Sequence, residues 1–177
     1  FWVMPVLAAL PIWALMYALT LDKPTPKTAG PITEGATVYS GNCAGCHGPT
    51  GGGIGSAPQL SAGAVVTTFP KASDQLHWIM EGTEGFQTLG LKTYGAQNKP
   101  VGGSGGKMPG WKATLTAEQL ISVVRHERET LSGEKLDAAT LKTEYDEMLA
   151  MVEKNYPDRK AEFEAAIAGW AALPPTS

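Results

Sequence analysis

The five residues from Cys43 to His47 read Cys-Ala-Gly-Cys-His and carry the most specific chemistry in the sequence. Two thiols three positions apart can add across the two vinyl groups of one haem, and the adjacent imidazole can bind its iron from the same turn of chain. We therefore predict that Cys43 and Cys46 attach one haem c covalently and that His47 is a ligand of its iron.

Other uses of a cysteine pair suit the rest of the chain less well. A structural zinc ion needs four ligands, but the chain has 2 cysteines, and His77 and His126 lie far from the motif with no paired spacing. A redox-active pair is typical of a strand-helix-strand unit, whereas this motif ends a predicted helix over residues 33–47. A disulfide between the two cysteines stays geometrically possible, but it gives the adjoining histidine no role.

An uncharged segment, Phe1 to Leu21, precedes the motif. A helix of this length spans about 30 Å, the thickness of a bilayer's hydrocarbon core, so residues 1–21 are predicted to cross a membrane. The alternative is a cleaved signal peptide, whose apolar stretch is shorter, about 7 to 15 residues, and is followed by small residues at the cleavage site. The proline-rich residues 22–32 are predicted to form an extended linker that keeps the following domain near the bilayer.

Two predicted helices flank the region that follows the linker. The first, over residues 33–47, contains Gly35-x-x-x-Tyr39-x-x-x-Cys43, in which a small residue allows another helix to come close. The second, over residues 116–130, opens with a Thr116-x-x-Gln119 capping box between Leu115 and Leu120, a hydrophobic staple.

Together with Cys-x-x-Cys-His and the pair Met108-Pro109, these features resemble a class I cytochrome c domain. The resemblance covers a little over half of the chain and implies an all-α fold. The domains expected are a transmembrane anchor helix (1–21), a linker (22–32), the haem domain (33–131) and a C-terminal helical extension (132–177).

The resemblance also implies the remaining site residues. A six-coordinate haem needs a second axial ligand, and a thioether raises its potential relative to a second imidazole. Met80 and Met108 are the methionines outside the anchor and the extension, and Met108 matches the family's Met-Pro signature, so we expect Met108 to ligate and Met80 to pack in the core. Pro58 is expected to offer its carbonyl to the ring of His47. His77, a third candidate ligand, is expected to face solvent or a haem propionate, and His126 to pack.

One departure from the family lies between Gly82 and Met108, where about 25 residues replace the few that are usual. Gly82 is expected to end a short capped helix that starts at Ser73. The following segment is predicted to be a long loop that covers the haem edge or meets a partner. Four of its lysines either present positive charge to redox partners or form ordinary solvated surface: Lys92, Lys99, Lys107 and Lys112.

Beyond Gly133, apolar residues recur at helical spacing in two stretches that meet near Pro157. A minimal class I domain has neither helix. Each has one apolar face that must be buried, either on the haem domain or against another subunit, and we expect an antiparallel pair.

The sequence as a whole predicts an electron-transfer protein without catalytic residues. The net charge of -3 argues against a nucleic-acid partner. The expected partners are the membrane, other subunits of a respiratory complex and redox proteins that link a quinol-oxidising complex to a terminal oxidase. Haem is attached to such proteins outside the cytoplasm, so the haem domain is expected on the periplasmic or extracytoplasmic side of the cell membrane. The alternative is a haem enzyme, a peroxidase or small-molecule reductase with a displaceable sixth ligand.

Overall fold

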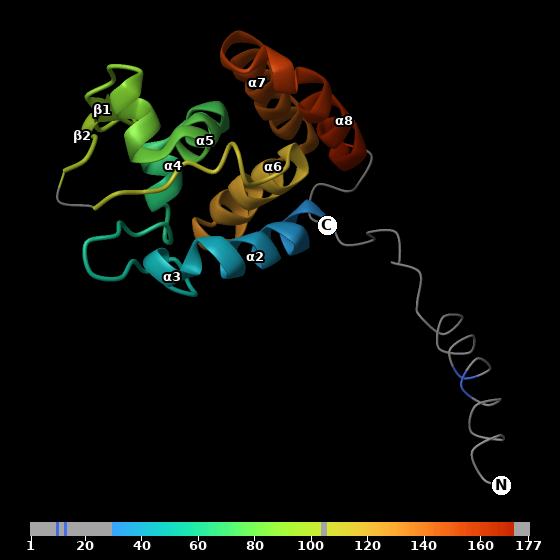
Figure 1. Cartoon of the computed structure of the whole chain (residues 1–177), viewed down its shortest axis with the longest axis horizontal. Coiled ribbons are helices and arrows are strands. Elements are labelled where there is room, and N and C mark those ends of the chain that lie inside the picture. Colours follow the sequence, from blue (N-terminus) through green and yellow to red (C-terminus); the bar gives the residue numbers. More distant parts are fainter. Residues whose placement is uncertain (1–9, 11–12, 14–29, 104–105, 172–177) are drawn as a thin grey trace, which may run out of the picture.

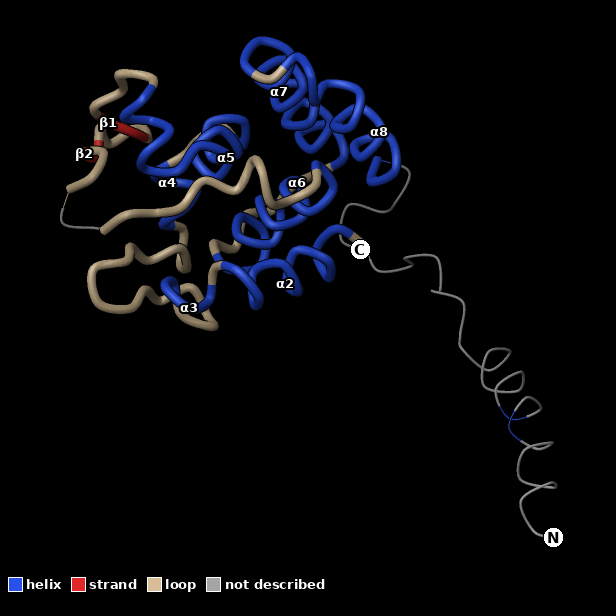
Figure 2. The backbone as a smooth tube through the Cα atoms, viewed as in Figure 1, coloured by secondary structure: helices blue, strands red, loops and turns tan. Residues whose placement is uncertain are grey.

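A computed structural model describes residues 10, 13, 30–103 and 106–171 of the chain. Most of these residues are helical, and two short strands pair with each other (Figure 2). The elements are α2 (Pro31–Asn42), α3 (Ala44–His47), α4 (Ala64–Thr68), α5 (Ala72–Thr88), β1 (Thr93–Tyr94), β2 (Lys99–Pro100), α6 (Ala117–Arg125), the π-helix η1 (His126–Leu131), α7 (Ala138–Asn155), the 3-10 helix η2 (Pro157–Arg159) and α8 (Lys160–Ala171).

Helices α2 and α6 pack against each other through Gly35. A Cβ atom built on Gly35 would overlap the backbone carbonyl of Ser122 and would lie 2.7 Å from Cβ of His126, so only glycine permits this approach. The ring of His126 lies 5.5 Å from that of Tyr39, and both residues are buried. The close crossing expected at Gly35 and the packing role expected for His126 are both confirmed.

The start of α6 also follows the sequence prediction. Thr116 Oγ1 accepts a hydrogen bond from the backbone N–H of Gln119, and the Gln119 side chain accepts one from the backbone N–H of Thr116. Leu115 and Leu120 are both buried in the main core, as the staple requires. The start of α6 is therefore fixed at the point where the chain leaves residues 106–116, the Met108 segment.

Helix α5 breaks at Gly82 but does not end there. Gly82 has a φ of 63°, in the left-handed region that favours glycine, and the helix resumes beyond it to Thr88. The carbonyls of Ile79 and Met80 are therefore free to accept hydrogen bonds from another segment. They bind the backbone N–H groups of Trp111 and Lys112 at 3.0 and 3.1 Å.

The break in α5 also lets Thr83 form two hydrogen bonds with the backbone of Met108. Thr83 donates its backbone N–H to the carbonyl of Met108 at 2.9 Å, and its hydroxyl accepts the backbone N–H of Met108 at 3.0 Å. A short helix that ends at Gly82 was therefore the wrong prediction. So was a long structureless loop, because residues 83–88 are helical and β1 pairs with β2 as an antiparallel hairpin.

The C-terminal helices pack back on α5 and α6. Helix α7 contacts α5, and α8 contacts α6, on the side of α6 away from α3 (Figure 1). Their apolar faces join the main core through Leu141, Tyr145, Met148, Val152, Phe163, Ile167 and Trp170. The sequence left open whether these faces are buried on the haem domain or against another subunit, and in the structure they are buried on the haem domain.

The predicted membrane helix over residues 1–21 lies outside the described residues, apart from Leu10 and Trp13. Within the part of the chain that the structure describes, no helix combines the length and apolar character of a membrane span. Most of the predicted linker, residues 22–32, is likewise outside it, and α2 starts at Pro31.

Replacing Gly82 by alanine tests the contact between α5 and the Met108 segment. A Cβ at Gly82 would lie 2.5 Å from backbone atoms of Met108, Pro109 and Gly110. We expect Gly82→Ala to lower the free energy of unfolding by about 3 to 5 kcal/mol in urea titrations, from backbone strain and overlap together.

The matched control is Gly90→Ala. Gly90 has a φ of 75° but no heavy atom within 4 Å of the added Cβ, so it carries the strain without the overlap. Its expected loss is about 1 to 2 kcal/mol. Equal losses for the two variants would contradict the packing of the segment against the break.

Candidate haem site

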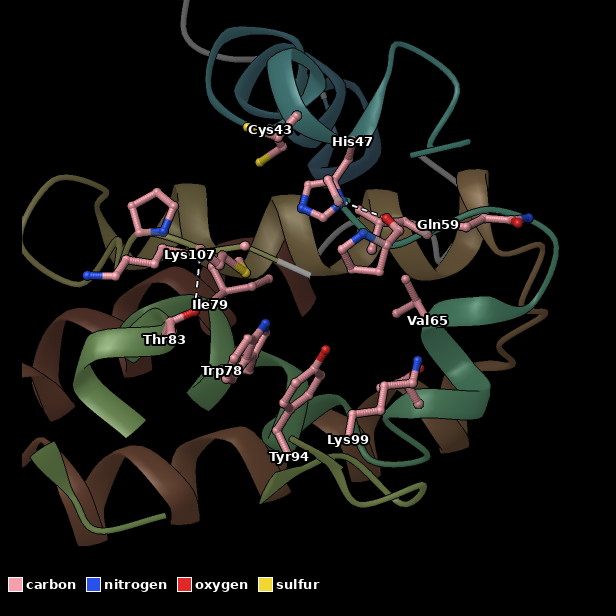
Figure 3. Close-up of a pocket in the computed structure, with 18 of the residues that line it drawn as sticks. Cys43, His47, Gln59, Val65, Trp78, Ile79, Thr83, Tyr94, Lys99 and Lys107 are labelled. Carbon is pink, nitrogen blue, oxygen red and sulfur yellow. Dashed lines mark hydrogen bonds between the residues drawn. The ribbon is translucent and has the colours of Figure 1, made fainter. Parts of the chain in front are cut away.

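A cavity of about 530 Å³ lies between α3 and the broken helix α5. Its lining includes Cys43, Cys46, His47, Pro58 and Met108, the five residues that the sequence and the resemblance singled out. In Figure 3, Cys43 and His47 project into it from one wall, and Trp78, Ile79 and Tyr94 project from the facing wall. The structure thus brings together residues that span more than sixty positions of the sequence.

Both cysteines are free, and burial disfavours the thiolate of Cys43. They are not bonded to each other; Cys46 is exposed and Cys43 is partly buried. Burial raises the pKa of the Cys43 thiol to about 12, assisted by the nearby Glu127 and Cys46. Metal-binding and redox-active cysteines have lowered pKa values instead. No group of three or more metal-binding side chains of the His, Cys, Asp or Glu type occurs in the described part of the chain.

His47 is buried and its ring is oriented by Pro58. Nδ1 of His47 lies 2.9 Å from the carbonyl oxygen of Pro58. A carbonyl can only accept, so Nδ1 carries the proton, and Nε2 is left with the lone pair that binds a metal.

A tight turn brings Pro58 to this position. Gly53 has a φ of 81°, and a Cβ there would lie 2.6 Å from the carbonyl oxygen of Ala57. The backbone N–H groups of Gly53 and Ile54 bind the carbonyls of His47 and Cys46 at 2.8 and 3.0 Å. The turn is therefore folded back against the haem motif.

Met108 belongs to the facing wall. It is partly buried, lines the cavity and packs against both hydrophobic clusters of the molecule. Both the N–H and the carbonyl of its backbone form hydrogen bonds with Thr83, and the bond from the N–H is drawn in Figure 3. The segment on either side of it has no regular secondary structure between Gly106 and Gly110.

Three residues with polar ends line the cavity although the sequence assigned them no place there, and Lys99 was expected at a docking or solvated surface instead. Trp78 and Tyr94 stack with ring centroids 4.0 Å apart, and Lys99 donates to Thr68 Oγ1 at 2.8 Å. Their indole, phenol and ammonium groups gather at one end of the cavity (Figure 3). Such donors suit carboxylates, and a haem carries two propionates. The sequence signal for them was the turn-forming Gly95 and Asn98, both at positive φ, which brings Tyr94 opposite Lys99.

A carboxyl group also lines the cavity. Glu127, in η1, is buried and accepts a hydrogen bond from Gln75 Nε2 at 2.8 Å. Burial raises the pKa of this carboxyl to about 7, while the bond from Gln75 acts in the opposite direction. The group is therefore poised to change charge near neutral pH. No sequence motif marked it, because its burial follows from the packing of η1.

The other candidate ligands lie elsewhere. His77, Met80 and His126 are not among the described residues that line the cavity. Met80 is fully buried in the core, as expected. His77 was expected to face solvent or a propionate; it is half-buried and lies away from the cavity. Its ring lies 5.0 Å from that of Phe86 and 6.0 Å from that of Tyr156, and burial lowers its pKa.

The site fits a covalently attached haem. It offers two thiols beside a histidine whose free nitrogen is fixed by Pro58, a thioether on the facing wall and a cavity within the usual size of cofactor pockets, about 300 to 1,000 Å³. The family model for cytochrome c matches residues 32–126, more than half of the chain. Searches of curated proteins and of solved structures found no match. The chain therefore belongs to the cytochrome c family, as a class I c-type cytochrome that carries covalently bound haem c.

Proposed function

We propose that this protein is a membrane-anchored, single-haem electron carrier in which Cys43 and Cys46 form the thioethers and His47 and Met108 are the axial ligands. The cytochrome c family transfers electrons through haem, and this general role follows from membership. When bound, the haem supplies a one-electron couple. The chain's own residues bind, orient and shield it.

The observation that carries the proposal is the pair of hydrogen bonds between the backbone of Met108 and Thr83. A haem enzyme needs an iron position that substrate can occupy, whereas a methionine fixed by its backbone on both sides favours a position filled by protein. Pro58 supports the same role from the opposite side, because an oriented imidazole keeps one geometry in both oxidation states.

The route to a partner is proposed at the cysteine edge of the cavity. Cys46 is exposed and Ile54 beside it is 55% exposed, so an apolar contact can form there. Of the four lysines given either a docking role or an ordinary place on the solvated surface, two form ion pairs. Lys107 pairs with Glu84 at 3.1 Å, and Lys112 pairs with Glu81 at 2.7 Å.

The anchor and the partners are part of the proposal. Residues 1–21 hold the haem domain at the periplasmic or extracytoplasmic face of the cell membrane. There the protein receives electrons from a quinol-oxidising complex and passes them to a terminal oxidase or a soluble carrier, as a subunit or a shuttle. The uncharged stretch and its short linker support this arrangement.

Met108→Ala tests the ligand set. We expect the oxidised parent protein to show the weak sulfur-to-iron absorption band at the red end of the visible spectrum and to bind carbon monoxide slowly when reduced. The variant should lose the band and bind carbon monoxide rapidly, because its sixth position is open.

The control for that test is Met80→Leu, a substitution of similar volume in the core that should keep the band. Rapid binding of carbon monoxide or cyanide by the parent protein would favour the haem enzyme instead.

Removal of residues 1–21 behind a cleavable export signal tests the anchor. The full chain is expected in the membrane fraction after alkaline carbonate washing, and the shortened chain in the soluble extracytoplasmic fraction with the same haem content. Detergent extracts of the full chain should contain the quinol-oxidising or oxidase subunits. Full-length protein in the soluble fraction would contradict anchoring.

Glu127 predicts a pH-dependent reduction potential. Its pKa is raised to about 7, so the carboxyl is neutral below this pH and charged above it. A negative charge beside the cavity stabilises ferric haem, so the potential should fall as pH rises through about 7, by no more than about 59 mV per pH unit. Glu127→Gln should flatten this region in redox titrations and raise the potential above pH 7.

Glu144→Gln is the matched control. Burial also raises the pKa of Glu144 to about 7, but Glu144 lies on α7, pairs with Arg128 and is not among the described residues of the cavity wall. The titration curve of this variant should keep the parent's slope. A slope that survives Glu127→Gln unchanged would assign the effect to another group.

A further inference from the structure

The connection between α7 and α8 binds the Met108 segment from the side away from the cavity. Arg159 donates from Nη1 to the carbonyl of Lys112 at 2.8 Å and from Nη2 to the carbonyl of Leu115 at 3.2 Å. Glu162 pairs with the same guanidinium at 2.7 Å and orients it. One side chain of the extension thus holds two points of the chain that leads from Met108 to α6.

A second contact from this connection reaches the break in α5. The hydroxyl of Tyr156 donates to Glu81 Oε1 at 2.7 Å, and Lys112 Nζ donates to both oxygens of the same carboxylate. The Glu81 side chain is only 6% exposed and directly precedes Gly82. A single carboxylate therefore joins the extension, the break and the Met108 segment.

The extension also caps the helix that follows. Glu162 Oε1 accepts the backbone N–H of Ala117, the first residue of α6, at 2.6 Å. A carboxylate at a helix N-terminus is stabilising there. The stretch from Lys112 to Ala117 is thus fixed by Arg159 and Glu162 of the extension, while Met108 faces the cavity.

The extension's side of these contacts, Tyr156, Arg159 and Glu162, lies outside residues 32–126, which the cytochrome c family model matches. The Met108 segment has no regular secondary structure, and such segments open locally at a smaller free-energy cost than helices do. Opening of this segment would remove the thioether from the iron. Contacts of Tyr156 and Arg159 that oppose this opening would therefore lengthen the time for which Met108 stays on the iron.

We propose that Tyr156 and Arg159 are positioning residues for Met108, so that the C-terminal extension keeps the sixth ligand of the haem in place. This inference rests on the proposed ligation by Met108. It assigns to the extension a role in ligand retention in addition to burial of its own apolar faces.

The test uses the full haem-loaded chain and the rate at which cyanide binds the oxidised protein. Binding requires Met108 to leave, so the rate reports the opening equilibrium. Arg159→Leu removes two charge-assisted hydrogen bonds to the segment, and we expect cyanide to bind about tenfold faster or more. The sulfur-to-iron band should disappear at a lower pH than in the parent, while haem content stays equal.

Tyr156→Phe is the milder second variant. It removes one hydroxyl, retains the ring beside His77 and should accelerate cyanide binding severalfold. It keeps the test usable if Arg159→Leu fails to fold.

The matched control is Lys160→Leu, one residue further on. Lys160 pairs with Glu153 and Glu164, both within the extension, so its loss should leave the cyanide rate and the band unchanged. Parent-like cyanide rates in both test variants, with the band present in the parent, would overturn the positioning role alone. A band that persists in Met108→Ala would overturn the ligand assignment and this inference with it.

Discussion

The break of α5 at Gly82 is the constraint on which the haem site depends. It frees the carbonyls of Ile79 and Met80 from their own helix, and these groups then bind the segment that carries Met108. An unbroken helix would satisfy those carbonyls internally and leave the segment without a partner. The cavity therefore has two walls that are built differently, one that carries Cys43, Cys46 and His47 and one that carries Met108. The cysteine wall is built by local turns next to the motif, and the methionine wall by contacts between residues about 25 positions apart.

Much of the cysteine wall could be predicted from sequence because its signals are local. Cys-x-x-Cys-His fixes its own few residues, and the Thr116–Gln119 box fixes the start of α6 in the same local way. The methionine wall could be predicted only in part. Met108 stood out beside Pro109, but a glycine inside a helical pattern indicates an end more often than a break that resumes. Glu127 carried no signal at all, because its burial depends on Gln75, which lies 52 positions earlier and contacts it only in the folded chain.

Apolar contacts bury the extension on the haem domain, and a buried charge restricts how α7 can lie there. Arg128 is 1% exposed and forms two bonds to Glu134, a third to the carbonyl of Phe69 and an ion pair with Glu144 of α7. A buried guanidinium is strongly destabilising when a partner is removed, although a complete network adds little net stability over an apolar one. Its value lies in specificity, because few arrangements of α7 satisfy this cation. The same arrangement of α7 places Tyr156 against Glu81 and Arg159 against the carbonyl of Lys112 in the Met108 segment.

The central claim, that His47 and Met108 hold one haem iron between them, is tested most directly by proton NMR of the reduced, diamagnetic protein. A methionine methyl group on the iron lies over the porphyrin ring, so its ring current shifts that resonance far upfield of all other methyl signals. The account predicts one such resonance, present in Met80→Leu and missing in Met108→Leu. Absence of any upfield methionine methyl in the parent protein, or its survival in Met108→Leu, would contradict the account.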